Sequence, residues 1–149
     1  MLTETVLVSD NEAQRLHREL YHCSEDAYRR VEDLLAAVAA LSADLRRVHI
    51  VATWSDLLRL ALWKQEPKIG DLFLLLKGTG VRSEELLPFK DADIGDMFPW
   101  LYYGKRLDTL RKICRVAKEN AEKHLRNREA RVHTHLVSAE VHRIVASSL

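Results

Sequence analysis

The stretch GKRLDTLRK, residues 104–112, decides between two interpretations of the fold. Leu107 and Leu110 are three residues apart, which places them on one face of a helix. Asp108 is the only acid in the stretch, among four basic residues. The stretch is therefore either the start of a basic helical arm or part of a packed helix in which Asp108 has a structural partner.

A long helix is expected to follow from this point. Between Lys105 and Leu149 the chain contains neither Gly nor Pro, the two residues least favourable inside helices. An apolar stripe at helical spacing consists of Leu107, Leu110, Cys114, Ala117, Ala121 and Leu125. From Val137 the apolar residues change phase, so we expect either two helices or one helix whose last part buries a different face.

The preceding sequence also predicts helices and no strand. After a loose start over residues 1–10, apolar spacing predicts helices over 11–23, 25–41, 42–52, 56–64, 68–80 and 91–104, with a brief turn at 84–89. The pentapeptides IGDLF (69–73) and IGDMF (94–98) are expected to begin helices in the same way, with an Asp in the first turn.

The predicted fold is therefore all-α, a compact bundle of about six helices. We assign the bundle to residues 25–116, as an interaction domain. A partly helical segment, 1–24, precedes it, and a helical extension, 117–149, follows it.

Composition bounds the class of protein. A chain of 149 residues suits one domain, and its 47% hydrophobic content is enough for a packed core. Two cysteines give neither a zinc-ligand spacing nor a disulfide framework, which suits a reducing compartment. The apolar run LLAAVAAL at 34–41 is too short to span a bilayer, and the acidic N-terminus does not resemble a signal peptide. We expect a cytoplasmic protein that does not contact membranes.

No catalytic, cofactor-binding or metal-binding motif is found in the sequence. The chain lacks the P-loop, GxGxxG, GxSxG and HExxH patterns, so we predict that it is not an enzyme. On a helix, His133 and His135 would point to different sides, and His135 and His142 would share a face without a third ligand nearby. The seven histidines are therefore interpreted as ordinary helical residues, and neither a metal nor a cofactor is predicted.

The net charge of +1 conceals an asymmetry along the chain. Residues 1–100 carry a net charge of −5, whereas residues 101–149 carry +6. A chain with one acidic and one basic part can bind polyanions through the basic part, or bind a second copy of itself.

In the basic part of the chain, acidic residues alternate with basic ones at helical spacing. Residues 105–131 hold ten Lys or Arg and four acids, and Asp108, Glu119 and Glu122 each stand four residues before a base. This order favours pairing within a helix and indicates a solvated surface. Nucleic-acid binding is kept as the alternative function, because net positive charge remains. Its contacts would be Lys112, Arg115, Lys118, Lys123 and Arg126.

From about Tyr28 to Val116 the pattern resembles a death-effector domain, a member of the six-helix death-fold superfamily. The segments YRRVEDLLAAVAALS, SADLRRVHIVAT and IGDLFLLLKGTG are similar to its first, second and fourth helices. IGDMFPWLYYGKRLDTLRKI resembles the fifth and sixth, which carry an R-x-D-L motif in that family. Here the motif reads Arg106, Leu107, Asp108 and Thr109, with Thr109 in the place of Leu.

The resemblance implies a charge triad and a contact surface. The triad would consist of Asp44, Arg106 and Asp108, since one guanidinium can donate to two carboxylates. The family's exposed apolar patch on the second helix would include Ile50. Together with the aromatic run WLYY, this gives the expected partner contacts Ile50, Arg46, Arg47, Trp100, Tyr102 and Tyr103.

The function that follows from the resemblance is homotypic protein–protein interaction. We expect an adaptor or regulator in a signalling or immune-type assembly, which binds protein partners and self-associates into an oligomer or filament. The charge asymmetry suits head-to-tail contact between copies. A structural helical subunit of an oligomer is a further alternative that the sequence does not separate from the first.

Overall fold

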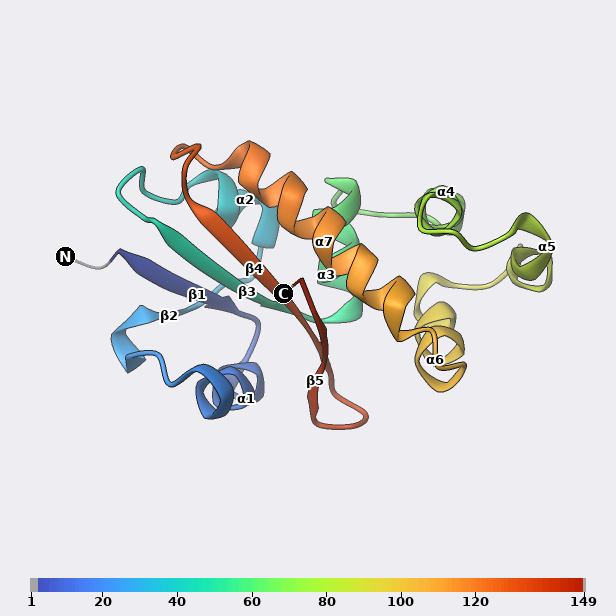
Figure 1. Cartoon of the computed structure of the whole chain (residues 1–149), viewed down its shortest axis with the longest axis horizontal. Coiled ribbons are helices and arrows are strands. Elements are labelled where there is room, and N and C mark those ends of the chain that lie inside the picture. Colours follow the sequence, from blue (N-terminus) through green and yellow to red (C-terminus); the bar gives the residue numbers. More distant parts are fainter. Residues whose placement is uncertain (1–2, 149) are drawn as a thin grey trace.

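A five-stranded sheet runs through the middle of the computed structural model, which describes residues 3–148 (Figure 1). Its order is β2-β1-β3-β4-β5; the strands are β1 (Glu4–Val8), β2 (Tyr28–Arg30), β3 (Arg47–Ala52), β4 (Arg131–Ser138) and β5 (Arg143–Ser147). The first four are parallel, and β5 pairs antiparallel with β4. The predicted all-α bundle, and the death-effector-like fold with it, is therefore wrong.

Helices lie on both faces of the sheet (Figure 1). The helix α1 (Asn11–Tyr21) lies on one face, and α2 (Leu34–Ala39), α3 (Trp54–Leu62) and α7 (Leu107–His124) lie on the other. A second group of helices extends beyond one end of the sheet: α4 (Ile69–Gly78), α5 (Ser83–Leu86), the 3-10 turn η2 (Leu87–Phe89) and α6 (Ile94–Tyr103). A further 3-10 turn, η1 (Glu25–Ala27), leads into β2.

Strands of this one sheet come from all three segments of the predicted division, 1–24, 25–116 and 117–149. The larger core lies between the sheet and the helices α2, α3 and α7, with Val48, Ile50 and Leu136 as its main strand residues. A smaller core under α1 joins Val6, Val8, Val51 and Val137 to Ala13 and Leu16. Among residues 3–148, no helix has both the length and the apolar character that a bilayer crossing requires.

The helix predicted over 42–52 is a loop followed by β3. The strand RVHIVA hydrogen-bonds to β1 on one side and β4 on the other, and all of its residues after Arg47 are buried. A parallel strand buried on both faces reads as a nearly continuous apolar run, without the alternation that marks a half-exposed strand. Such a short run is not distinguished from a buried helix by its periodicity.

The helix predicted to continue to the C-terminus ends at His124, and two strands follow. In β4, Val132 and Leu136 face the larger core, whereas Val137 faces α1. Side chains alternate across a strand, so His133 and His135 lie on the same face as Val137. The alternation is thus complete, but two positions on the α1 face hold histidines, of which His135 is buried and His133 half-buried, and this composition hides the strand pattern in the sequence.

Other sequence predictions are confirmed. The predicted stripe residues Leu110, Cys114, Ala117 and Ala121 of α7 are buried, as is Leu125 directly after the helix. Leu107 at the first turn is the exception, because its side chain is 38% exposed. The two IGD segments begin α4 and α6 in the same way. The Asp71 carboxylate accepts a hydrogen bond from the Lys68 N–H at 2.9 Å, and Asp96 accepts one from the Asp93 N–H at 3.0 Å.

The predicted triad does not form. The Arg106 guanidinium donates to the Glu85 carboxylate, with Nη2 and Oε1 2.7 Å apart, and its Cζ lies 4.6 Å from the centre of the Trp100 ring. Asp108 is largely exposed and lies 3.4 Å from Arg111. Asp44 is exposed in the loop before β3. The expected clasp to Asp44 is therefore wrong, because the acid that Arg106 holds is Glu85 of α5.

Energetic coupling should therefore join Arg106 to Glu85. We expect Arg106→Ala and Glu85→Ala to be non-additive in urea unfolding, because either change leaves the other side chain without its charge-assisted hydrogen bonds. Arg106→Ala with Asp44→Ala is the matched control and should be additive. Coupling in the second pair with none in the first would support the triad instead.

Candidate functional site

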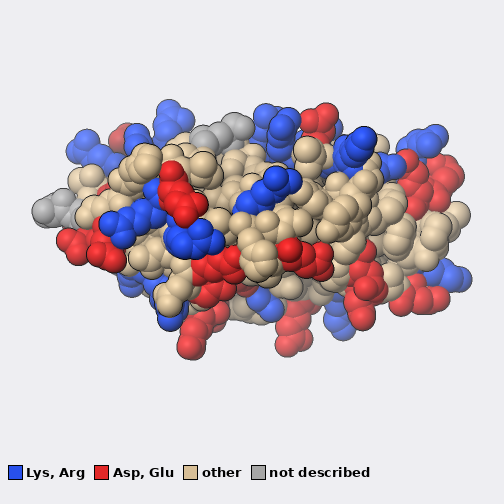
Figure 2. Space-filling view, turned by 90° about the horizontal axis from the view of Figure 1, so that it is seen from below, with Lys and Arg blue, Asp and Glu red and all other residues tan. Residues whose placement is uncertain are grey.

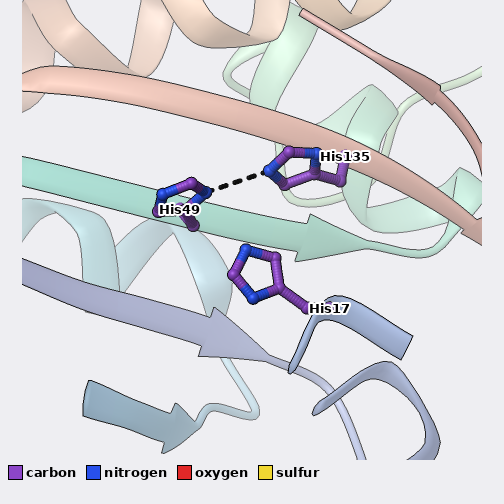
Figure 3. A group of neighbouring side chains, drawn as sticks. All are labelled: His17, His49 and His135. Carbon is purple, nitrogen blue, oxygen red and sulfur yellow. Dashed lines mark hydrogen bonds between the residues drawn. The ribbon is translucent and has the colours of Figure 1, made fainter. Parts of the chain in front are cut away.

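Three buried histidines from distant parts of the sequence converge between α1 and the sheet (Figure 3). His17 comes from α1, His49 from β3 and His135 from β4, and their exposed fractions are 0%, 5% and 0%. One donor atom from each of the three lies within 4.8 Å of the others. This is the densest group of buried titratable side chains in the part of the chain that the structure describes.

The strand register brings two of the rings together. His49 is opposite His133, and His135 is opposite Val51, so His49 and His135 are diagonal neighbours on the face that α1 covers. Their rings are nearly parallel, with an interplanar angle of 9° and centroids 5.3 Å apart. The Nδ1 atom of His49 and the Nε2 atom of His135 are 3.1 Å apart, a hydrogen bond that holds one proton between two nitrogens.

The third ring is supplied by the apolar face of α1. Asp10 caps this helix by accepting a hydrogen bond from the Ala13 N–H at 2.8 Å, which fixes where the helix begins. His17 then falls four residues after Ala13 and points toward the sheet with Leu16. In Figure 3 one nitrogen of its ring faces the space between His49 and His135.

Each ring has a polar neighbour at its outer nitrogen. Nδ1 of His17 is 2.7 Å from the Tyr28 hydroxyl, and Nδ1 of His135 is 2.7 Å from the Ser147 hydroxyl. Nε2 of His49 lies 3.8 Å from a carboxylate oxygen of Glu4. The two hydroxyls can donate or accept, so they are compatible with either tautomer of their ring, and Nε2 of His17 is buried without any hydrogen-bond partner.

Burial keeps these histidines neutral. Loss of solvation, with a smaller effect of His49, lowers the pKa of His17 to about 4. Loss of solvation, with a smaller effect of His133, lowers the pKa of His49 to about 4. Loss of solvation also lowers the pKa of His135 to about 3, with smaller effects of the other histidines. At neutral pH each of the three rings is therefore neutral and has one unprotonated nitrogen, and a metal ion that binds displaces the proton shared by His49 and His135.

The inward nitrogens match the donor set of a zinc-type metal ion. A tetrahedral ion with Zn–N bonds of about 2.0–2.1 Å holds two nitrogen ligands about 3.3 Å apart. The His49 and His135 nitrogens are already 3.1 Å apart, and the unpartnered His17 nitrogen is the third donor. Metal-bound histidines generally donate their other N–H to a hydroxyl, carbonyl or carboxylate, as the outer neighbours here allow.

A pocket of about 440 Å³ opens beside His49. It is lined by Glu4, Tyr21, His22, Cys23, Ser24, Arg47, His49 and His133. Donor atoms of Glu4, Cys23 and His49 form a second group within 4.8 Å of one another. His49 thus belongs to both groups.

The predicted partner contacts do not form one surface. Ile50 is completely buried in β3, so it cannot belong to an exposed apolar patch. Arg46 and Arg47 are exposed beside it, and Arg47 lies in the pocket near Glu4, 3.5 Å away. The aromatic residues lie on α6, where Trp100 and Tyr102 are half-buried and Tyr103 is 62% exposed.

The predicted nucleic-acid contacts lie along and just beyond α7. Lys112 donates to the Thr79 carbonyl at 3.0 Å, and Lys118 pairs with Glu122 at 2.8 Å, so these two cations already have partners. The remaining three, Arg115, Lys123 and Arg126, are exposed. On the face viewed in Figure 2, basic and acidic side chains are interspersed. Nucleic-acid binding stays a prediction.

The three-histidine group was missed from the sequence because its members are 32 and 86 residues apart. Metal motifs in sequences are recognised by short spacings within one element, and these ligands come from three elements. A signal did exist in each element. His17 lies on the apolar face of its helix, and His49 and His135 stand inside runs of Val, Ile, Thr and Leu.

Mild acid should destabilise the fold. In the folded chain the pKa values of His17 and His49 are about 4 and that of His135 is about 3, against an ordinary value of 6.5. Below pH 6.5 the unfolded chain therefore binds more protons than the folded chain. The free energy of unfolding, measured with urea, should change little between about pH 7 and 8 and fall as the pH decreases toward 4.

The control is the exposed His22 at the end of α1, whose left-handed backbone (φ 52°) Asn tolerates. His22→Asn should leave this pH profile unchanged. A free energy of unfolding that stays constant from pH 6.5 to 4.5, where carboxylates begin to titrate, would contradict the neutral buried cluster.

Comparison with known proteins assigns no family to this arrangement. No protein-family model, curated protein or solved structure matches the chain. The expected relation to the death-fold superfamily thus has no support from the comparisons, and the α/β sheet contradicts it. A function is therefore inferred from the chemistry of the three converging histidines.

Proposed function

We propose that this chain binds a divalent transition metal ion, with zinc as the best fit, through Nε2 of His17, Nδ1 of His49 and Nε2 of His135. The observation that carries the proposal is their convergence: three buried imidazoles turn one nitrogen each toward a common point. Each ring also has a polar group at its other nitrogen.

Packing alone is a weaker account of the cluster. A buried polar atom without a hydrogen bond costs about 1–3 kcal/mol, and Nε2 of His17 is such an atom. The hydrogen bond between His49 and His135 satisfies those two nitrogens but leaves Nε2 of His17 without a partner. A cation at the common point would serve all three nitrogens at once.

The donor set selects the class of metal. Imidazole nitrogen suits zinc, copper, nickel and iron, whereas magnesium and calcium prefer oxygen ligands. Protons compete only weakly for these rings, because burial lowers the pKa of each to about 4 or below. Zinc is the best fit because it accepts nitrogen ligands in tetrahedral geometry and requires no redox partner.

Such an ion would connect α1 to two central strands. His17, His49 and His135 belong to α1, β3 and β4, so one ion would hold together three elements far apart in the sequence. Three protein ligands also leave a four-coordinate ion one position for water or a small ligand, as in catalytic rather than structural zinc sites.

The other functional predictions are untested. Homotypic contact of the death-fold type is no longer proposed, because that fold is absent. Self-association through another surface, and the absence of enzymatic activity, stay predictions. A coordination position open to exogenous ligands makes an assay for hydrolytic activity worthwhile once a metal is bound.

Zinc should stabilise the folded chain. If the ion binds only the folded state, a free zinc concentration roughly 100 times the Kd raises the free energy of unfolding by about 2.7 kcal/mol. Thermal melts with zinc and with a chelator measure this difference. His17→Leu and His135→Leu should reduce it, because each removes one donor of the three-histidine site and keeps an apolar side chain in the core.

The variant His142→Asn is the matched control and should respond to zinc as the unmodified chain does, because His142 is exposed, lies outside both donor groups and has a left-handed backbone (φ 52°) that Asn tolerates. Equal zinc stabilisation in the unmodified chain and in His17→Leu would show that zinc binds elsewhere. Calorimetric titration of the same variants gives the number of sites independently of stability.

A further inference from the structure

We infer that the pocket beside His49 is a second metal site, formed by Glu4, Cys23 and His49, and that His49 is shared between the two sites. The inference rests on the proposed three-histidine site only for the sharing. The second site is otherwise inferred from its own donor atoms, which include a thiol and a carboxylate.

The two nitrogens of His49 face different groups. Its Nδ1 lies 3.1 Å from His135 in the buried cluster, and its Nε2 lies 3.8 Å from Glu4 on the pocket side. One donor atom each from Glu4, Cys23 and His49 falls within 4.8 Å of the others. An imidazole ring in this position can bind one ion through each nitrogen.

The pocket supplies access and a further donor. Its volume of about 440 Å³ admits a metal ion together with water or a small ligand. His133 lines the same pocket, its ring centre lies 5.1 Å from that of His49, and its Nδ1 is buried without a hydrogen-bond partner. Rotation of this ring would add a fourth protein ligand to the second site.

The site assembles because β1 and β3 are paired in register. Glu4 stands opposite Arg47 and Val6 opposite His49, so Glu4 and His49 project from the same face of neighbouring strands. Cys23 follows α1 closely, and its Sγ lies within 4.8 Å of a carboxylate oxygen of Glu4. The thiol and the carboxylate are therefore near neighbours before any ion binds.

Binding of the second ion exchanges protons for metal. Burial, with the neighbouring Glu4, raises the pKa of Cys23 to about 11, so the free thiol is protonated at neutral pH. The incoming ion forms a bond to Cys23 Sγ and one to His49 Nε2, and the S–H and N–H protons leave to solvent. Thiolate, carboxylate and imidazolate then offset most of the charge of two divalent ions.

Among the residues that line the pocket, Arg47 is the one Lys or Arg, and its charge opposes binding of a cation. Its guanidinium lies 3.5 Å from Glu4, a long contact, and its side chain is 61% exposed. Such an exposed pair contributes little to stability, so Arg47 can turn away into solvent when an ion replaces it as the partner of Glu4.

Cobalt(II) titration of the reduced full-length chain, followed by absorption, tests the inference. We expect two equivalents to bind. One of them should produce the near-ultraviolet charge-transfer band that a thiolate–cobalt bond gives and imidazole ligands do not.

Three variants assign the sites. Cys23→Ser should remove the charge-transfer band and one equivalent, whereas Cys114→Ala, at the buried cysteine of α7, should keep both. His17→Leu should remove the other equivalent and keep the band. His49→Ala should impair both sites, because each uses one nitrogen of that ring.

The outcomes separate the two proposals. One equivalent without a charge-transfer band overturns the second site and supports the three-histidine site. One equivalent with a band that Cys23→Ser abolishes and His17→Leu does not alter supports the thiolate site and overturns the three-histidine site. Loss of only one equivalent in His49→Ala overturns the sharing of that ring.

Discussion

The pairing of β3 with β1 on one side and β4 on the other is the constraint on which the rest of the structure depends. It makes β3 the centre of the sheet, buried on both faces, with Val48 and Ile50 toward one core and Val51 toward the other. Parallel strands require crossover connections, and these place helices on the two faces. The same register sets His49 beside His133 and diagonal to His135.

The histidine cluster occupies positions where an α/β protein ordinarily places aliphatic side chains. Burial of polar groups is unfavourable unless hydrogen bonds or ligands compensate for it. Here the compensation is partial: the outer nitrogens have polar neighbours, but Nε2 of His17 has none. An uncompensated polar atom within a well-packed core is a reason to look for a ligand, and the converging lone pairs identify its chemistry as that of a metal ion.

The sequence determined the helices better than the sheet, for a physical reason. In α7 the spacing of Leu110, Cys114 and Ala117 follows the helical period over several turns, so the buried face was predicted correctly. β3 is short and buried on both faces, which removes the alternating pattern, and in β4 two positions of the face under α1 hold histidines. The pairing partner of Arg106 also required three-dimensional information, since Glu85 lies 21 residues earlier.

The site could not be predicted for a related reason. Its donors are brought together by strand register and by the packing of α1, both of which are long-range properties of the fold. In the sequence, each of the three elements has a histidine at a position where its pattern predicts an apolar residue. These three histidines indicate a shared site only when the helix and the two strands that carry them are known to be neighbours.

Anomalous diffraction at the zinc absorption edge, from crystals grown with zinc, tests the central claim most directly. The account predicts a peak enclosed by His17 Nε2, His49 Nδ1 and His135 Nε2, at about 2.0–2.1 Å from each nitrogen. Zinc bound only elsewhere, with the hydrogen bond between His49 and His135 intact, would contradict it.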